Sequence, residues 1–190
     1  MIRGLETRRL ILRPLELGDA SQAQALFANW EIVRFLASRV PWPYPADGCE
    51  TYYRDVAIPG MERGDEWHSS LRLKDAPNQL IGSIALTRGE EDNRGFWIGL
   101  PWQRLGLMSE GVEAANDYWF DELSFQVLRA PKAVDNLASR RISEKTGMRI
   151  VASMEKNFVS GRFLSETREI TADEWRARRS GKGQRPVHEL

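Results

Sequence analysis

The sequence predicts a single domain of the mixed α/β class, and three observations support this prediction. The chain has 190 residues, which suits one domain and leaves too few for a second core. Segments with strand-like alternation and segments with helix-like spacing follow one another along it. Hydrophobic residues make up 42% and charged residues 28%, as in ordinary globular proteins. We assign the domain to residues 1–179 and a mobile tail to residues 180–190.

The first third of the chain predicts a strand followed by two helices. The strand covers 8–15 and stops near Pro14. Apolar residues then recur at a spacing of three to four, which predicts a helix with Asp19 as its N-cap. The prolines within 41–45 cannot continue a helix, and a second helix is expected over 46–61.

Three strands with short polar connections predict an antiparallel meander in the middle of the chain. They cover 67–74, 80–87 and 96–100. Residues 75–78 have the composition of a turn. Gly99, inside the third strand, indicates a bulge or a close approach of the backbone.

The last part of the chain alternates helices and strands. In chain order we expect a helix over 109–123, a strand over 127–134, a helix over 137–146, strands over 148–154 and 163–170, and a last helix from Thr171. Pro131 interrupts the first of these strands or places it at an edge. Gly147 suits a left-handed C-cap, and Thr171 with Glu174 forms a capping box.

Charge and cysteine content exclude several classes of function. Lys plus Arg and Asp plus Glu both number 27, so the chain has no overall basic field for nucleic acid or anionic lipid. Cys49 is the single cysteine, which excludes an internal disulfide, and no Cys/His pattern suggests a metal site. No apolar run approaches the roughly 20 residues that span a bilayer. We expect a cytoplasmic protein with no metal and no membrane partner.

The segment from 98 to 110 is the most informative, because a strand there leads through a glycine-containing loop into a helix. Free N–H groups at the positive end of a helix form an anion site. Gln103 and Arg104 add side-chain donors, and the Arg104 charge suits phosphate. The alternative is a turn that needs Gly106 only for its geometry. The segment matches neither a Walker loop nor a dinucleotide fingerprint.

A second motif begins the helix expected over 137–146. Asn136 and Ser139 are three residues apart, so they lie on the same side of the helix start. Asn136 either contacts a ligand or caps the helix with its side-chain oxygen.

These motifs together resemble the GNAT superfamily of acetyl-CoA-dependent N-acetyltransferases, in its RimJ/RimL-like branch. Residues 6–16 resemble the opening strand of that branch, and 80–86 resemble its third strand. Residues 103–108, Gln-Arg-Leu-Gly-Leu-Met, resemble its Gln/Arg-x-x-Gly-x-Gly/Ala pyrophosphate loop. Residues 136–148 resemble its Asn-x-x-Ser helix and the segment that follows. The resemblance covers about residues 6–175.

This resemblance implies a fold and an activity. The GNAT fold has a central twisted mixed sheet of about six or seven strands flanked by helices, with a V-shaped splay between strands four and five. Here those are the strand that ends at Leu100 and the strand over 127–134. Acetyl-CoA is the implied cosubstrate, and the acceptor is a primary amine, either a protein N-terminus or a small molecule. The amine attacks the thioester directly in a ternary complex.

The resemblance also implies the residues of the site. Pantetheine would pair with the backbone of 98–100, and the diphosphate would lie on amides of 104–109. The implied CoA-binding residues are Ile98, Gly99, Leu100, Gln103, Arg104, Leu105, Gly106, Leu107, Met108, Ser109, Asn136, Ser139 and Lys145. Asn136 would reach the pantetheine or the amine, and the Ser139 hydroxyl would protonate or hydrogen-bond the departing thiolate.

Two positions depart from the family pattern. Met108 stands where the family usually has glycine or alanine, and its side chain either turns aside or narrows the site. Asn157 stands where the related ribosomal enzymes carry a glutamate, and an asparagine cannot accept a proton at neutral pH. Glu155, on the same side of the expected strand, is therefore the candidate base. Glu66 and His68, on an earlier strand, are further candidates.

Other features leave alternatives open. Five aromatic residues either fill a core contact or wall an acceptor pocket: Trp42, Tyr44, Tyr52, Tyr53 and Trp67. The departures at Met108 and Asn157 would also suit a protein that senses acyl-CoA without turnover. The basic stretch from Arg176 favours a solvated helix end over a contact with RNA. A homodimer is compatible with the sequence.

Overall fold

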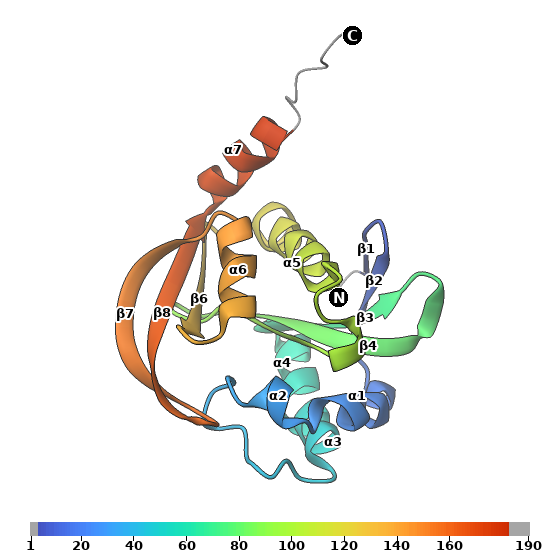
Figure 1. Ribbon diagram of the computed structural model, residues 1–190. Helices are drawn as coiled ribbons and strands as arrows, with labels where there is room; N and C mark the ends of the chain where they lie inside the picture. The colour runs from blue at the N-terminus through green and yellow to red at the C-terminus, as the bar shows by residue number, and fades with distance from the viewer. Residues whose placement is uncertain (1–3, 183–190) are drawn as a thin grey trace.

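The computed structural model describes residues 4–182, and its strands form two antiparallel sheets (Figure 1). The larger sheet has the order β1-β2-β3-β4-β5. Its strands are β1 (Leu5–Glu6), β2 (Leu10–Pro14), β3 (Glu66–Leu73), β4 (Ala76–Thr87) and β5 (Arg94–Ile98). The smaller sheet has the order β6-β8-β7 and consists of β6 (Val127–Ala133), β7 (Arg149–Phe158) and β8 (Gly161–Thr171).

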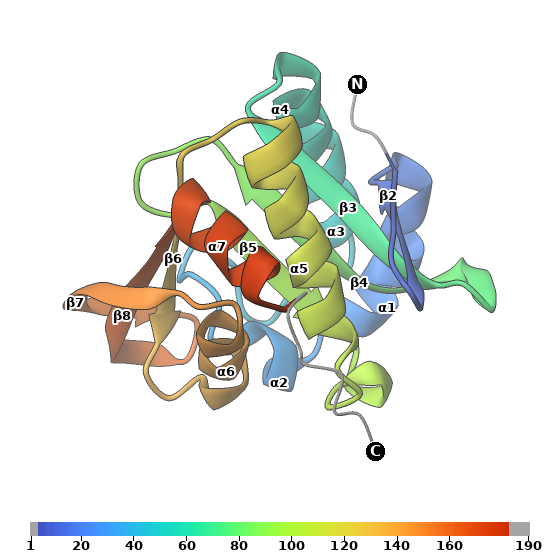
Figure 2. The ribbon, with the colours of Figure 1, turned by 90° about the horizontal axis from the view of Figure 1, so that it is seen from above.

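Helices cover both faces of the larger sheet (Figures 1 and 2). One face carries α1 (Ala20–Phe27), α2 (Trp30–Val33), α3 (Gly48–Tyr52) and α4 (Ile58–Arg63). The other face carries α5 (Leu107–Asp117), with α6 (Leu137–Lys145) and α7 (Ala172–Lys182) beside it. A π-helical turn over Tyr53–Ala57 joins α3 to α4, just before Pro59, whose missing N–H disfavours a regular helix at that point.

The main core lies between the larger sheet and α5. Leu10, Leu71, Val112 and Trp119 are at most 1% exposed there. A smaller cluster lies under α1 and α3 and includes Tyr53. Burial of these apolar side chains supplies most of the free energy that holds the layers together, at about 25 cal/mol per Å² of apolar surface.

The meander of β3, β4 and β5 confirms the prediction, whereas the first helix differs from it. The helix expected from Asp19 onward is divided at Ala28, and Asn29 caps the second part, α2, by accepting the N–H of Glu31. The Asp19 side chain does not cap α1. Its carboxylate is instead buried in an ion pair with Arg72 of β3. A buried charge is costly unless a group of opposite charge pairs with it.

The turn predicted over 75–78 was misplaced. Ala76 already pairs with Leu73, so the connection between β3 and β4 is tighter than the composition suggested. The helix predicted over 109–123 begins earlier, at Leu107, and changes into a π-helical turn over Tyr118–Glu122. The last helix runs to Lys182 and so includes the start of the predicted tail; residues 183–190 of that tail lie outside the described residues.

The arrangement of the strands also differs from the prediction of a single sheet with about six or seven strands. Within residues 4–182, eight strands are divided between the two sheets, and β5 and β6 are the two facing edges. The predicted splay therefore lies between these two strands.

Candidate active site

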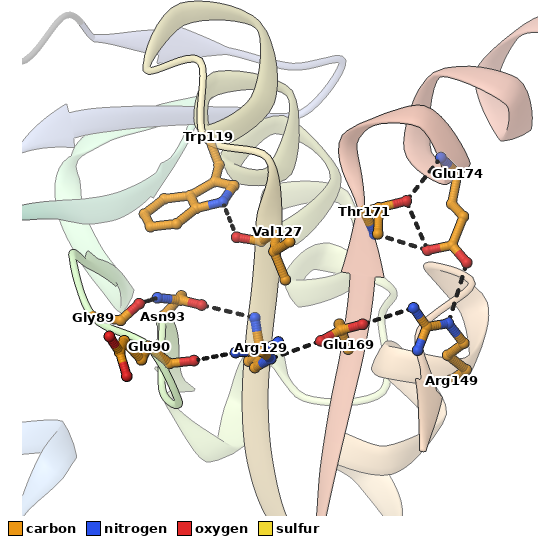
Figure 3. A network of polar contacts seen from close by, with 10 residues as sticks. All are labelled: Gly89, Glu90, Asn93, Trp119, Val127, Arg129, Arg149, Glu169, Thr171 and Glu174. Atoms are coloured by element: carbon orange, nitrogen blue, oxygen red, sulfur yellow. Dashed lines mark hydrogen bonds and ion pairs between the residues drawn. The ribbon is translucent and has the colours of Figure 1, made fainter. Parts of the chain in front are cut away.

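The edges β5 and β6 are joined by Asn93, which lies just before β5 (Figure 3). The Asn93 N–H donates to the Arg129 carbonyl of β6 at 2.7 Å, and its Oδ1 accepts the Arg129 N–H at 2.8 Å. Its Nδ2 donates to the carbonyls of Thr87 and Gly89, and the residue is 2% exposed. Within residues 4–182, β5 pairs only with β4, and β6 only with β8. The two strands thus meet at this Asn93 clasp without forming a ladder.

Pro131 explains why no ladder continues beyond the clasp. In an antiparallel pair, alternate residues direct their backbone groups to the partner strand. The N–H of Val134, the residue after β6, donates to the Leu164 carbonyl of β8, so the backbone groups of the even-numbered residues of β6 point toward β8 and those of the odd-numbered residues point toward β5. The odd residue after Arg129 is Pro131, which has no N–H to donate. The sequence prediction that this proline places the strand at an edge is confirmed.

The opposite edge, on β5, presents backbone groups of its even-numbered residues. The Gly99 N–H donates to the Ile81 carbonyl of β4 at 2.8 Å, so Ile98 is directed the other way, toward β6. The Ile98 carbonyl accepts the Nε2 of Gln103 at 3.2 Å. A chain that enters between the strands would find an extended backbone edge at Phe96 and Ile98.

The loop from β5 to α5 has the backbone geometry of an anion cradle. Gly99 permits Trp102 to pack closely, since a Cβ there would lie 2.9 Å from the indole. Arg104 and Gly106 both have positive φ values, 62° and 77°. Gly106 is the N-cap of α5, and no side chain caps this helix. The N–H groups of the first turn, 107–109, therefore have no capping side chain as a partner.

A brace that sequence reasoning missed holds this loop to the N-terminal strand. Glu110, in the first turn of α5, accepts hydrogen bonds from the Thr7 hydroxyl, the Arg9 N–H and the Arg9 guanidinium at 2.5 to 2.7 Å. Arg9 also donates to the Leu105 carbonyl at 3.0 Å. Partial burial opposes ionisation of Glu110, but the bonds from Thr7 and Arg9 outweigh it and lower the pKa of this carboxyl.

Met108 turns aside from the loop. Its side chain is 6% exposed and packs in the main core, as does the side chain of Leu107. The first of the two alternatives for Met108 is therefore correct, and its thioether does not narrow the loop. Gln103, Arg104 and Leu105 are exposed around the loop, and Ser109 is half-buried.

The second motif lies at the start of α6, directly after β6. The Asn136 Oδ1 accepts the Ser139 N–H at 3.1 Å, so the capping interpretation of Asn136 is confirmed. Ser139 is buried at 9% exposure. Lys145 is exposed in the last turn, about 9 Å farther along the helix axis at 1.5 Å per residue.

The candidate bases all have partners. Glu155, on the edge strand β7, forms an ion pair with Arg162 at 2.6 Å, and both side chains are mostly exposed. Asn157 is exposed on the same strand. His68 of β3 is 3% exposed, and its Nε2 lies 2.6 Å from a carboxylate oxygen of Glu66.

The aromatic residues do not form one cluster. Trp67 packs edge-on against Trp119 on the α5 side of the sheet. Tyr53 is 4% exposed in the smaller core. These two fill core contacts, as one of the two interpretations expected. Trp42 and Tyr52 keep 43% and 41% exposure.

The hairpin of β7 and β8 reaches across to the loop after α2 (Figure 1). The Ser160 hydroxyl donates to the Arg34 carbonyl at 2.6 Å, and the Val159 N–H donates to the Leu36 carbonyl at 3.0 Å. This contact, together with the Asn93 clasp, fixes the smaller sheet relative to the larger one at two separate points.

Two buried cations lie beside the divergence of β5 and β6, and sequence reasoning did not identify either. Lys132 of β6 is 7% exposed and Arg94 of β5 is 2% exposed. Burial lowers the pKa of Lys132 to about 7, and repulsion from Arg94 adds to this effect. Lys132 lies on the same buried face of β6 as Leu128 and Ala130, and this alternation is the signal in the sequence that could have placed the lysine inward.

No group of His, Cys, Asp or Glu side chains within residues 4–182 could hold a metal ion. In the same part of the chain, no helix has the length and apolar character needed to cross a membrane.

Comparison with known families finds one family model that matches most of the chain. The model described as "Acetyltransferase (GNAT) domain" matches residues 9–149. Among curated proteins, the chain is 26% identical to the probable N-acetyltransferase YjcK of Bacillus subtilis over 163 residues, which cover 80% of this chain and 87% of YjcK.

Solved structures with the same fold include two acetyltransferases bound to coenzyme A. The ribosomal L7/L12 α-N-protein acetyltransferase RimL superposes with a TM-score of 0.76 at 15% identity and covers 90% of this chain and 99% of its own. The spermidine N-acetyltransferase of Vibrio cholerae, solved with CoA and spermine, has a TM-score of 0.74 at 21% identity and covers 89% and 99%. At these identities the likeness concerns the fold.

Proposed function

The chain belongs to the GNAT acetyltransferase family, and we propose that it transfers the acetyl group of acetyl-CoA to a primary amine, preferentially the α-amine of a polypeptide. One observation carries this proposal. An unpaired strand edge on β5 faces a strand that Pro131 prevents from pairing with it, and the uncapped first turn of α5 follows directly.

The residues of the cleft suit coenzyme A. Its pantetheine arm carries amides that would pair with the backbone of Phe96 and Ile98, and the Gln103 side chain would move from the Ile98 carbonyl. Its diphosphate would lie on the N–H groups of 107–109, at the positive end of α5. Arg104 would add a guanidinium donor. The turn of Met108 into the core leaves this backbone clear of its side chain.

Acetyl-CoA supplies an activated thioester, and the chain supplies position and polarity. A bound amine attacks the carbonyl carbon directly, and holding both reactants in one cleft supplies much of the rate enhancement. A backbone N–H of the β5 edge would stabilise the oxyanion. The backbone N–H of Ser139 donates to Asn136, and the buried Ser139 hydroxyl would donate to the departing sulfur.

The preference for an α-amine follows from the candidate bases. An α-amine has a pKa near 7.7–8.0, against about 10.4 for lysine, so a useful fraction is already neutral without a strong base. Glu155 is paired with Arg162, Asn157 cannot accept a proton, and His68 is buried on β3 at 3% exposure. An acceptor that needs little proton abstraction suits such a site. RimL, which shares the fold, is named for acetylation of a protein α-amine.

A panel of acceptors tests this function. We would incubate the protein with acetyl-CoA and follow release of the CoA thiol in the presence of peptides with a free α-amine, the same peptides blocked at the N-terminus but carrying lysine, and polyamines. We expect the fastest release with free α-amines. Fastest thiol release with polyamines would indicate that the preferred acceptor is a small-molecule amine. Tight binding of CoA without thiol release from any amine would indicate an acyl-CoA sensor instead.

A further inference from the structure

The Lys132 side chain reaches from β6 to β5. It lies on β6 immediately after Pro131, and its Nζ is 5.0 Å from the centre of the Phe96 ring on β5. A cation over an aromatic face is attracted by the ring quadrupole. Because β5 and β6 share no ladder here, this side chain contact spans the divergence between them.

The surroundings of Lys132 contain more buried cations than anions. Arg94 of β5 contacts only neutral groups through its terminal nitrogens, the Asn116 Oδ1 at 2.6 Å and the Met148 Sδ at 3.3 Å, and its Nε has no partner. Within the described chain, neither Arg94 nor Lys132 takes part in an ion pair. Burial lowers the pKa of Arg94 to about 10.

The other charged groups near Lys132 do not cancel this excess. Arg168 of β8 repels it, although Glu166 at 2.9 Å and Glu144 at 3.0 Å already neutralise that guanidinium. Asp92, before β5, is the acidic residue that attracts the Lys132 ammonium, and burial outweighs that attraction. An anion brought between β5 and β6, beside the Lys132 Nζ, would therefore be stabilised by the positive charge that the protein has already placed there.

We propose that the Lys132 ammonium stabilises the thiolate of coenzyme A as it leaves, and donates a proton to it. This inference rests on the proposed function, since it needs the sulfur of CoA between β5 and β6. The attacking nitrogen forms a bond to the acetyl carbon, the carbon–sulfur bond breaks, and sulfur keeps the electron pair. Lys132 gives its proton to sulfur, and the proton that the acceptor nitrogen loses returns to Lys132 through water. The products are the amide and the CoA thiol.

The Lys132 side chain differs in role from Ser139. The hydroxyl of Ser139 is neutral and can only donate a hydrogen bond, whereas an ammonium also supplies a full charge at short range. A partly protonated amine near neutral pH can both donate and recover a proton, as a general acid requires.

The acidity of the thiol in bound CoA tests this proposal without catalysis. The full chain is saturated with CoA, and thiolate absorbance is followed against pH, with the complex of desulfo-CoA as the blank. We expect a thiol pKa in the wild-type complex at least about one unit below that in Lys132→Met, a tenfold difference in ionisation. Lys132→Arg, which keeps the charge, should restore part of the shift. Lys74→Met, at the exposed β3–β4 turn, should match the wild type.

Each outcome is decisive. Equal thiol pKa values in the wild type and Lys132→Met, with CoA bound to both, would overturn the role of Lys132 and leave the proposed function intact. Failure of the wild type to bind CoA in calorimetry would overturn both. Rapid stoichiometric acetylation of Lys132 by acetyl-CoA, mapped by mass spectrometry, would show a nucleophile in place of an acid and would also overturn the proposed role.

In turnover, we expect Lys132→Met to lower kcat about tenfold or more with little change in KM for acetyl-CoA. Lys132→Gln provides a second neutral variant should the methionine variant not fold.

Discussion

Lys132 is a buried cation that lowers the stability of the folded chain near neutral pH. Its pKa falls from the ordinary lysine value to about 7 on folding, so the unfolded chain holds this proton more tightly than the folded chain does. The destabilisation is fully present below about pH 7 and disappears as the pH rises toward the unfolded pKa near 10. Residues that reduce stability in this way are often retained for function.

We therefore expect Lys132→Met to be more stable than the wild type at pH 6, with a higher Tm. The difference should narrow as the pH rises above about 7, because the wild type then loses the unfavourable charge. Thermal unfolding at several pH values measures this. The exposed Lys74→Met serves as the control and should show no comparable trend. A wild type that is the more stable protein at pH 6 would contradict burial of a charged Lys132.

Ser139→Ala should lower kcat about tenfold and leave KM for acetyl-CoA nearly unchanged, because in the proposed mechanism this buried hydroxyl donates to the departing sulfur. The matched control is Ser143→Ala, one turn farther along α6, where the buried hydroxyl has no hydrogen-bond partner. Steady-state kinetics with a peptide acceptor measure both. An unaltered kcat for Ser139→Ala would remove the hydroxyl from the mechanism.

At the scale of single residues, local hydrogen bonding could be predicted and long-range packing could not. The Asn136 cap, the Thr171–Glu174 capping box and the left-handed Gly147 all follow from neighbours within a few residues. Asp19 also suits a cap, yet it is drawn away by Arg72, which lies far along the chain. The direction of the Met108 side chain depends on a core assembled from several elements, so the loop sequence alone leaves it open.

At the scale of elements, the start of α5 depends on a glycine in the left-handed region. Gly106→Val should weaken binding of CoA at least tenfold, because a β-branched residue at φ 77° must move the amides of the first turn. Calorimetric titration with CoA measures this. Gly64→Val is the matched control, since Gly64 has φ 75°, faces open space and lies at the end of α4. Both variants should lose about 1–2 kcal/mol of stability. Equal CoA affinity in the two variants would argue against the loop before α5 as the binding site of the diphosphate.

The Asn93 clasp joins the start of β5 to β6. Asn93→Ala removes three hydrogen bonds and leaves the partly buried Arg129 N–H without its acceptor, so we expect a loss of about 2–3 kcal/mol. Hydrogen exchange at Arg129 should also accelerate. The exposed Asn78→Ala should stay within about 0.5 kcal/mol of the wild type. Denaturant unfolding measures both, and equal losses would show that the clasp does not hold the sheets.

The elements themselves were largely predictable, and their ends were less so. Periodicity placed the strands of the meander and the helix after the loop, since these segments are long and regular. The π-helical turns after α3 and α5, and the tight β3–β4 connection, depend on how neighbouring elements pack. Composition gives no signal for them.

At the scale of the whole molecule, the separation of β5 from β6 is a property of topology. The five-stranded and three-stranded sheets end in the edge strands β5 and β6, and Pro131 removes an N–H that a ladder between these two edges would use. Figure 3 shows that ion pairs continue from the Asn93 clasp into the smaller sheet: Arg129 also binds Glu169, which in turn binds Arg149. The proline was visible in the sequence, but its place opposite β5 required the fold that the resemblance supplied.

A crystal structure of the complex with CoA tests the central claim most directly. We predict the diphosphate on the N–H groups of 107–109, the pantetheine along Ile98, and the sulfur between β5 and β6 within reach of the Lys132 Nζ. Density for CoA outside this gap, or β5 and β6 hydrogen-bonded to each other along their length, would contradict the account.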